Sequence, residues 1–115
     1  MWEIELYATT KGEEVVADFL YSLPRKHRAK AIWEIELLAV QGTALTQPYV
    51  KHIEADLWEL RIKFSSDISR IFYFIPSQAK IVLLHGFVKK TDKTPPNELE
   101  TAKKRMQAYK ARCSE

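Results

Sequence analysis

The sequence predicts an α+β protein, on the basis of three observations. Two adjacent segments near the N-terminus and one near the C-terminus have apolar residues at helical spacing. Three segments between residues 57 and 88 have the composition of strands, and a further strand precedes the first helix. The length of 115 residues corresponds to one domain. We therefore expect a single domain over residues 1–115, with an antiparallel-rich sheet, an N-terminal helix pair and a C-terminal helix.

The N-terminal elements follow from periodicity and from the residues that end helices. Residues 2–6 alternate apolar and acidic side chains, which is typical of a half-buried strand. Apolar residues recur at helical spacing over 15–23, and Pro24 ends this helix because its ring blocks the preceding turn. A second helix is expected over about 25–41, with Gly42 as its C-terminal stop.

The segment 57–64 alternates with the period of two that marks a strand. It carries Trp58, Leu60, Ile62 and Phe64 on one face, and Glu59, Arg61 and Lys63 on the other. Segments 69–75 and 80–88 are apolar on both faces, as interior strands are, and Thr94 begins a third helix. We expect an antiparallel meander with the helices covering one face, so that Arg61 and Lys63 stand on the open face.

Charge is divided unevenly along the chain. Residues 1–57 carry six Lys/Arg and nine Asp/Glu, whereas residues 58–115 carry twelve Lys/Arg and six Asp/Glu. A basic C-terminal half favours contact with a polyanion, although solvated helices also carry lysines. The position of these residues on the fold has to decide between the two interpretations.

Several classes of protein are excluded by what the sequence lacks. No apolar run approaches the roughly 20 residues that span a bilayer, and the N-terminus does not have the composition of a secretory signal. Cys113 is the single cysteine, so no internal disulfide is expected. No phosphate-binding glycine loop, catalytic triad or metal-ligand spacing is present. We expect a cytoplasmic protein with no cofactor, no metal and no membrane contact.

The candidate site is a cationic surface on the open face of the sheet. Arg61 and Lys63 lie there beside the strand that starts near Arg70, and Arg and Lys side chains of this kind bind backbone phosphates. Lys89 and Lys90 add charge at one edge, and Lys51 just before the sheet is also assigned to RNA binding. Tyr73 is a candidate aromatic platform for a base.

RNA carries its own nucleophile in the 2′-hydroxyl group. Cleavage then requires in-line positioning, cations for the charged phosphorane, and groups that accept and donate a proton. Arg61, Arg70 and Lys63 are the candidate catalytic cations, and His85 and Tyr109 are candidates for proton transfer. Each of the last two has an alternative interpretation, as a buried structural histidine and as a residue of the apolar core.

The two arginines have structural alternatives as well. Arg61 and Glu59 are spaced as an ordinary surface pair, and Arg70 is near enough to Asp67 to close a turn. A surface pair of this kind contributes little to stability.

Four segments together resemble a known family. They are Leu-Trp-Glu-Leu-Arg at 57–61, Ser-Arg-Ile-Phe-Tyr-Phe at 69–74, Ile-Val-Leu-Leu-His-Gly-Phe-Val-Lys-Lys-Thr at 81–91, and Thr94-Pro95. In this order they resemble the phage-derived, HigB-like branch of the RelE/ParE toxins. The resemblance implies a RelE-like fold and a toxin of a type II toxin–antitoxin system. It also implies ribosome-dependent, metal-independent cleavage of messenger RNA, and a hetero-oligomer with a helix-turn-helix antitoxin of the HigA type encoded nearby.

The resemblance extends to individual residues. Arg61 and Arg70 match the sheet arginines of the family, Lys89 and Lys90 match its basic pair, and Lys63 fits a strand lysine. His85 and Tyr109 do not align with the proton-transfer residues of family members, so the general base stays unassigned. The same superfamily includes ParE-like toxins that inhibit DNA gyrase without cutting nucleic acid. That activity, and a plain RNA- or ribosome-binding module, are the alternative functions.

Overall fold

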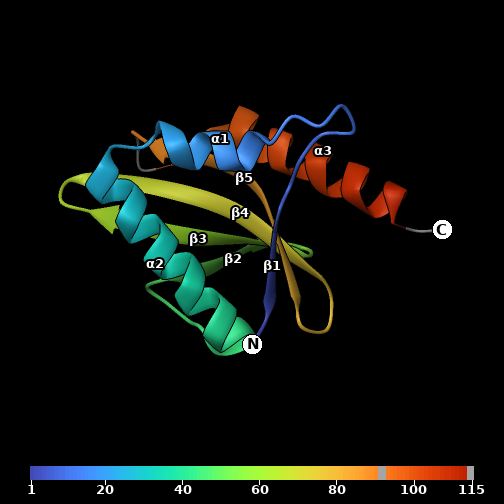
Figure 1. The fold of residues 1–115 in the computed structure, drawn as a ribbon, viewed down its shortest axis with the longest axis horizontal. Helices are drawn as coiled ribbons and strands as arrows, with labels where there is room; N and C mark the ends of the chain where they lie inside the picture. The colour runs from blue at the N-terminus through green and yellow to red at the C-terminus, as the bar shows by residue number, and fades with distance from the viewer. Residues whose placement is uncertain (91–92, 114–115) are drawn as a thin grey trace.

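The computed structural model describes residues 1–90 and 93–113 and has the predicted α+β architecture, consistent with a RelE-like fold. Figure 1 shows the elements in chain order. They are β1 (Glu3–Leu6), α1 (Val15–Ser22), α2 (Arg25–Gln41), the short 3-10 helix η1 (Gly42–Ala44), β2 (Val50–Glu54), β3 (Leu57–Phe64), β4 (Asp67–Ser77), β5 (Lys80–Lys89) and α3 (Pro96–Arg112).

The five strands form one mixed sheet in the order β1-β5-β4-β3-β2. The meander of β3, β4 and β5 is antiparallel, as predicted, and β1 lies parallel to β5 at one edge. The strand β2 was not predicted. It is a short edge strand that pairs antiparallel with β3, and most of its side chains are partly or fully exposed, so its composition gives little signal.

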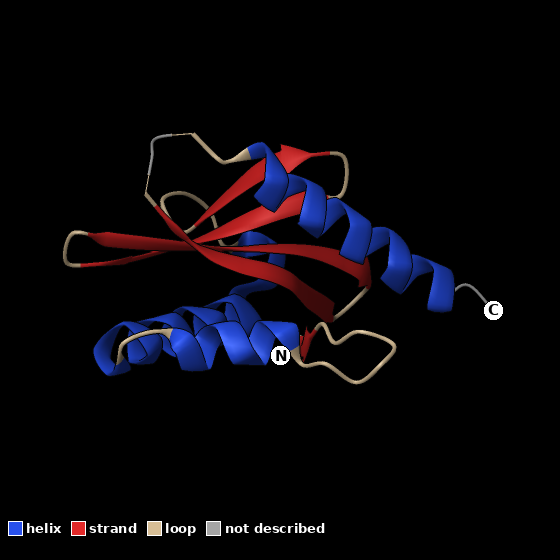
Figure 2. Ribbon diagram, turned by 90° about the horizontal axis from the view of Figure 1, so that it is seen from above, coloured by secondary structure: helices blue, strands red, loops and turns tan. Residues whose placement is uncertain are grey.

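The helices cover both faces of the sheet, so the expectation that they cover one face is wrong. Figure 2 shows α1 and α2 on one side of the sheet and α3 on the other. The helix α3 packs on β5 and β4, where the ring of Tyr109 meets the ring of Phe74 edge-on at 5.6 Å. The main contacts of α3 are with β5 and β4, and its Lys103 and Lys110 pair with Glu54 and Asp56 at the turn between β2 and β3. The part of this face around Arg61 and Arg70 is open as a pocket.

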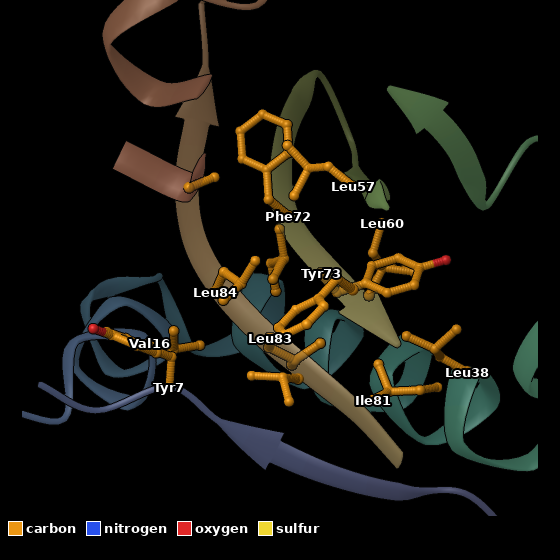
Figure 3. Close-up of a cluster of buried hydrophobic side chains, with 14 of the residues drawn as sticks. Tyr7, Val16, Leu38, Leu57, Leu60, Phe72, Tyr73, Ile81, Leu83 and Leu84 are labelled. Atoms are coloured by element: carbon orange, nitrogen blue, oxygen red, sulfur yellow. The ribbon is translucent and has the colours of Figure 1, made fainter. Parts of the chain in front are cut away.

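The core fills the space between the sheet and the helices. Leu60 and Ile62 on β3 are fully buried, whereas Arg61 and Lys63 between and after them are exposed, which confirms the predicted alternation. Trp58 on the face of Leu60 is half-buried rather than enclosed. Figure 3 shows how side chains from β3, β4, β5, α1 and α2 meet in one apolar cluster.

Two glycines permit close packing around this core. A Cβ atom on Gly42, which has a φ of +52°, would lie 1.9 Å from Nε1 of Trp2, and one on Gly86 would lie 2.3 Å from the ring of Phe19. Both neighbours are rings packed directly on the backbone, so any larger residue would displace them. Gly42 thus seats the N-terminal segment against the end of α2, and Gly86 seats α1 against β5.

Candidate nucleic-acid interface

A pocket of about 510 Å³ lies beside α3 on the face of the sheet that this helix packs on. We call it the basic hollow and define it by its charged lining residues: Lys51, Glu59, Arg61, Arg70, Lys89 and Lys93. Gln47 and Pro48 before β2, Val50 and Ile53 on β2, and Thr94 before α3 also line the hollow. The hollow therefore collects cations from four strands, β2, β3, β4 and β5, and from the segment that leads into α3.

The register of the strands explains why these cations meet. Arg61 on β3 is directly opposite Arg70 on β4, and side chains at directly opposed positions lie on the same face of a sheet. Lys89 on β5 is opposite Ile68, two residues from Arg70, and therefore projects from that face as well. The cationic surface predicted from the alternation in β3 is thus extended across β4 to β5.

Arg70 and Glu59 form a buried ion pair at the base of the hollow. Glu59 has no exposed surface and Arg70 is 7% exposed, and a terminal nitrogen of the guanidinium bonds to Oε1 of Glu59. This pairing differs from both structural alternatives, which placed Glu59 with Arg61 and Arg70 with Asp67. Oε2 of Glu59 and Nε of Arg70 are buried without a hydrogen-bond partner.

The other predicted cations lie at the margin of the hollow. Lys63 is exposed and lines a neighbouring pocket of about 330 Å³ together with Lys30, Glu34, Pro48, Tyr49 and Arg61. Arg61 and Pro48 therefore line both pockets. Lys90 is exposed directly after β5. Thr91, which completes the Gly-Phe-Val-Lys-Lys-Thr segment, lies outside the described residues.

Glu34 on α2 is a buried carboxylate beside this second pocket that the sequence did not single out. It is 1% exposed, its Oε1 has no partner, and its Oε2 pairs with Lys30 at 3.2 Å. Burial raises the pKa of Glu34, and the hydrogen bond to Lys30 opposes that rise. Its position on the helix four residues after Lys30 fits an ordinary surface ion pair and so gave no sign of burial.

Tyr73 does not belong to the hollow, and its prediction as a stacking platform is wrong. It is opposite Trp58 on the face of the sheet that packs on α1 and α2, and it is 3% exposed. Figure 3 shows its ring among the side chains of the apolar cluster. Burial raises the pKa of its hydroxyl group. With only 3% of the residue exposed, its ring lacks the open face that a stacked base needs.

His85 on β5 bonds to side chains of α3 and does not line the hollow. Its Nδ1 lies 3.1 Å from a guanidinium nitrogen of Arg105, and its Nε2 lies 2.9 Å from Oε1 of Glu98. A guanidinium group only donates hydrogen bonds, so Nδ1 accepts and Nε2 carries the proton that it donates to Glu98. Burial lowers the pKa of His85, although the bond to Glu98 opposes that shift. Both ring nitrogens are therefore engaged in the contact between β5 and α3.

Tyr109 also lies away from the hollow. It is 5% exposed, its hydroxyl group donates to Oε1 of Glu5 at 2.9 Å, and its ring packs on Phe74. Burial raises the pKa of this hydroxyl. The structure thus does not bring His85 or Tyr109 together with Arg61 and Arg70, because α3 holds both on the other half of the sheet face.

The described residues hold neither a cluster of metal ligands nor a membrane-spanning helix. No three or more of their His, Cys, Asp and Glu side chains come together in a way that would hold a metal ion. Within residues 1–90 and 93–113, no helix is long and apolar enough to cross a bilayer.

The chain is thus a small α+β protein with a mixed sheet between helices and a basic hollow on one face of that sheet. Residues 18–107 match the family model described as "Phage derived protein Gp49-like (DUF891)". This match covers most of the chain, so the protein belongs to the phage-derived Gp49-like family, a family of RelE-type, toxin-like proteins. A comparison with curated proteins finds no match.

Proposed function

We propose that this protein is the toxin of a type II toxin–antitoxin system, of the HigB-like branch, and that it cleaves messenger RNA on the ribosome. The observation that carries the proposal is the basic hollow, in which Arg61 and Arg70 are directly opposed and Lys51 and Lys89 flank them. A concave surface of this charge attracts a nucleic-acid backbone, and two adjacent guanidinium groups match the geometry of a phosphate.

In the proposed reaction the 2′-oxygen of one nucleotide attacks the adjacent phosphorus atom. The bond from phosphorus to the 5′-oxygen breaks, which leaves a 2′,3′-cyclic phosphate and a free 5′-hydroxyl group. The 2′-hydroxyl loses a proton and the departing 5′-oxygen gains one. Arg61 and Arg70 stabilise the negative charge that develops on the phosphorane oxygens. We assign no metal to the reaction, as the family resemblance implies, and no proton-transfer role to His85 or Tyr109.

The remaining lysines bind the strand on either side of the scissile phosphate. Lys51 and Lys89 contact phosphates within the hollow, and Lys63 and Lys90 extend the basic surface at its margin. Such contacts position the RNA and make its affinity dependent on salt. The proposal also includes a helix-turn-helix antitoxin of the HigA type from an adjacent gene, a toxin–antitoxin hetero-oligomer, and a cytoplasmic location.

Expression with and without the product of the adjacent gene tests this function. We expect the protein alone to stop growth, the neighbour to restore it, and primer extension to detect transcripts cut at defined positions. Intact transcripts in arrested cells, together with inhibition of DNA supercoiling by the purified protein, would instead support a gyrase inhibitor. Normal growth with abundant folded protein would contradict the toxin function altogether.

A further inference from the structure

The carboxylate of Glu59 is unexpected at the base of a hollow proposed to bind phosphates, because both groups are negatively charged. Glu59 has no exposed surface, yet it lines the basic hollow together with Arg61, Arg70 and the lysines. Its negative charge opposes the charge of an RNA backbone and so lowers affinity for the proposed substrate. A residue that weakens binding in this position must contribute something else.

The geometry of β3 and β4 indicates what Glu59 contributes. Glu59 and Arg61 are two residues apart on one face of β3, and Arg70 lies directly opposite Arg61. Glu59 and Arg70 are therefore diagonal neighbours, a separation that long side chains can bridge. The ion pair draws the guanidinium group of Arg70 along β3 toward Glu59.

Apolar rings lie beside the pair. Phe72 is opposite Glu59 in the register of β3 and β4, and Phe87 is opposite Arg70 in that of β4 and β5. The two rings are buried and stack at 5.6 Å between centroids. Arg70 is thus confined by packed rings and by a carboxylate, whereas Arg61 extends into solvent.

We propose that Glu59 is a positioning residue, which holds the Arg70 guanidinium in the orientation that the transition state needs. The inference rests on the proposed function. A phosphate in the hollow then meets one exposed and adaptable cation, Arg61, and one fixed cation, Arg70. A cation that is already oriented needs no reorganisation as charge develops on the phosphorane, so its effect appears in the rate. The charge of Glu59 meanwhile reduces the attraction for bound RNA.

If Glu59 orients Arg70 and also weakens the attraction for RNA, its loss should lower the cleavage rate without lowering RNA affinity. Glu59→Gln removes the charge but keeps the shape of the side chain, and Glu59→Asp keeps the charge but shortens the reach to Arg70. In single-turnover cleavage of messenger RNA on programmed ribosomes, both variants should lower the rate at saturating protein by about tenfold to a hundredfold. Glu59→Gln should also bind at an equal or lower protein concentration than the parent, whereas Glu59→Asp should bind as the parent does.

Glu5→Gln is the matched control, because it removes the same charge from another ion pair, that of Glu5 with Lys80. Glu5 lies on β1, at the opposite edge of the sheet from β3 and β2, and this variant should cleave at the parental rate. In an Arg70→Ala background, Glu59→Gln should lower the rate no further, since a positioning residue acts only through the group that it positions.

A measurement on the parent keeps the inference testable if the variants unfold. In solution NMR the Nε–H group of Arg70 should give a sharp signal that is protected from exchange, because Nε is buried and the ion pair with Glu59 keeps the guanidinium group in place. A rapidly exchanging Nε–H would overturn the inference. So would folded Glu59→Gln and Glu59→Asp proteins that cleave at the parental rate, or that lose affinity alone. If the parent itself leaves ribosome-bound RNA intact, the proposed function fails, and a comparison of the Arg70 signal between the parent and Glu59→Gln still reports whether Glu59 fixes the guanidinium group.

Discussion

Arg61 and Arg70 occupy directly opposed positions on β3 and β4, but they lie in different environments. Arg61 is exposed, whereas Arg70 is buried and paired with Glu59. Like charges directly opposite each other in a sheet are destabilising, and the buried carboxylate offsets that repulsion. Removal of Arg70 should therefore lower the stability of the fold, whereas removal of Arg61 should not. Substitutions at the two positions can be told apart by their effect on unfolding.

Arg61→Ala should remove activity without unfolding the protein. Loss of one preorganised contact to the developing charge lowers the cleavage rate by about a hundredfold, or about 3 kcal/mol. Because Arg61 is exposed, the melting temperature should stay close to that of the parent. Single-turnover cleavage and a thermal melt measure the two effects. A folded Arg61→Ala protein that cleaves at the parental rate would remove Arg61 from the site.

Arg70→Ala should affect both activity and stability. It leaves the carboxylate of Glu59 buried without its counter-ion, which costs about 3–5 kcal/mol when one partner of a buried pair is removed. Denaturant unfolding should show this loss, and a second substitution, Glu59→Gln, should recover part of it. Cleavage by the fraction that remains folded should be nearly abolished, while ribosome binding persists. An Arg70→Ala protein with parental stability would show that the buried ion pair with Glu59 does not contribute to the stability of the fold.

Lys89→Ala should weaken binding more than it slows chemistry. A lysine that contacts one backbone phosphate releases about one counter-ion, so its loss reduces the slope of affinity against salt by about 1. Binding to ribosomes measured at several salt concentrations tests this slope. Lys11→Ala, on the exposed loop before α1, is the control that changes charge elsewhere. Equal slopes for parent and Lys89→Ala would place Lys89 outside the RNA contact.

The His85 contact between β5 and α3 should make stability depend on pH. The folded protein lowers the pKa of His85 below its ordinary value of 6.5, so folding favours the neutral ring. The stability that this preference contributes is complete above pH 6.5 and is lost as the pH falls through the lowered value. Protonation of Nδ1 also removes the bond from Arg105 and places two cations together.

We therefore expect His85→Gln to flatten the dependence of the melting temperature on pH below 6.5, in comparison with the parent. His52→Gln, at an exposed position on β2, controls for the loss of a histidine. Parallel pH profiles for the parent and His85→Gln would assign the acid sensitivity to another group.

The sequence predicted the three α-helices, four of the five strands and one face of β3, because local patterns determine these features, whereas the exposed edge strand β2 was missed. Alternation in β3 placed Arg61 and Lys63 correctly, since a single strand with one polar face has an unambiguous pattern. It did not place Tyr73, because β4 is apolar on both faces and its pattern does not distinguish them. The register with β3 decides the face, and register depends on pairing across the sheet.

Long-range contacts explain why the sequence did not predict the position of α3, the contacts of His85 or the Glu59–Arg70 ion pair. The apolar stripe of α3 indicates that the helix packs on something, but not on which face of the sheet, and the position of His85 follows from that face. Glu59 and Arg70 are both visible in the sequence, but the alternative ion pairs that spacing suggests for them are with the chain neighbours Arg61 and Asp67. Their partnership spans two strands and so was recognised only in the folded structure.

The parallel pairing of β1 with β5 means that the sheet can be completed only late in synthesis. Glu3 is the partner of Lys80 and Leu6 is the partner of Leu83, so this edge of the sheet joins the beginning of the polypeptide to a late segment. The hairpin of β3 and β4 can form from local contacts during synthesis, whereas β1 can pair only after residues 80–83 have been made. The cations of Arg61, Arg70 and Lys89 are assembled on that same late sheet. A nascent chain therefore completes its hollow only after most of the protein has been made.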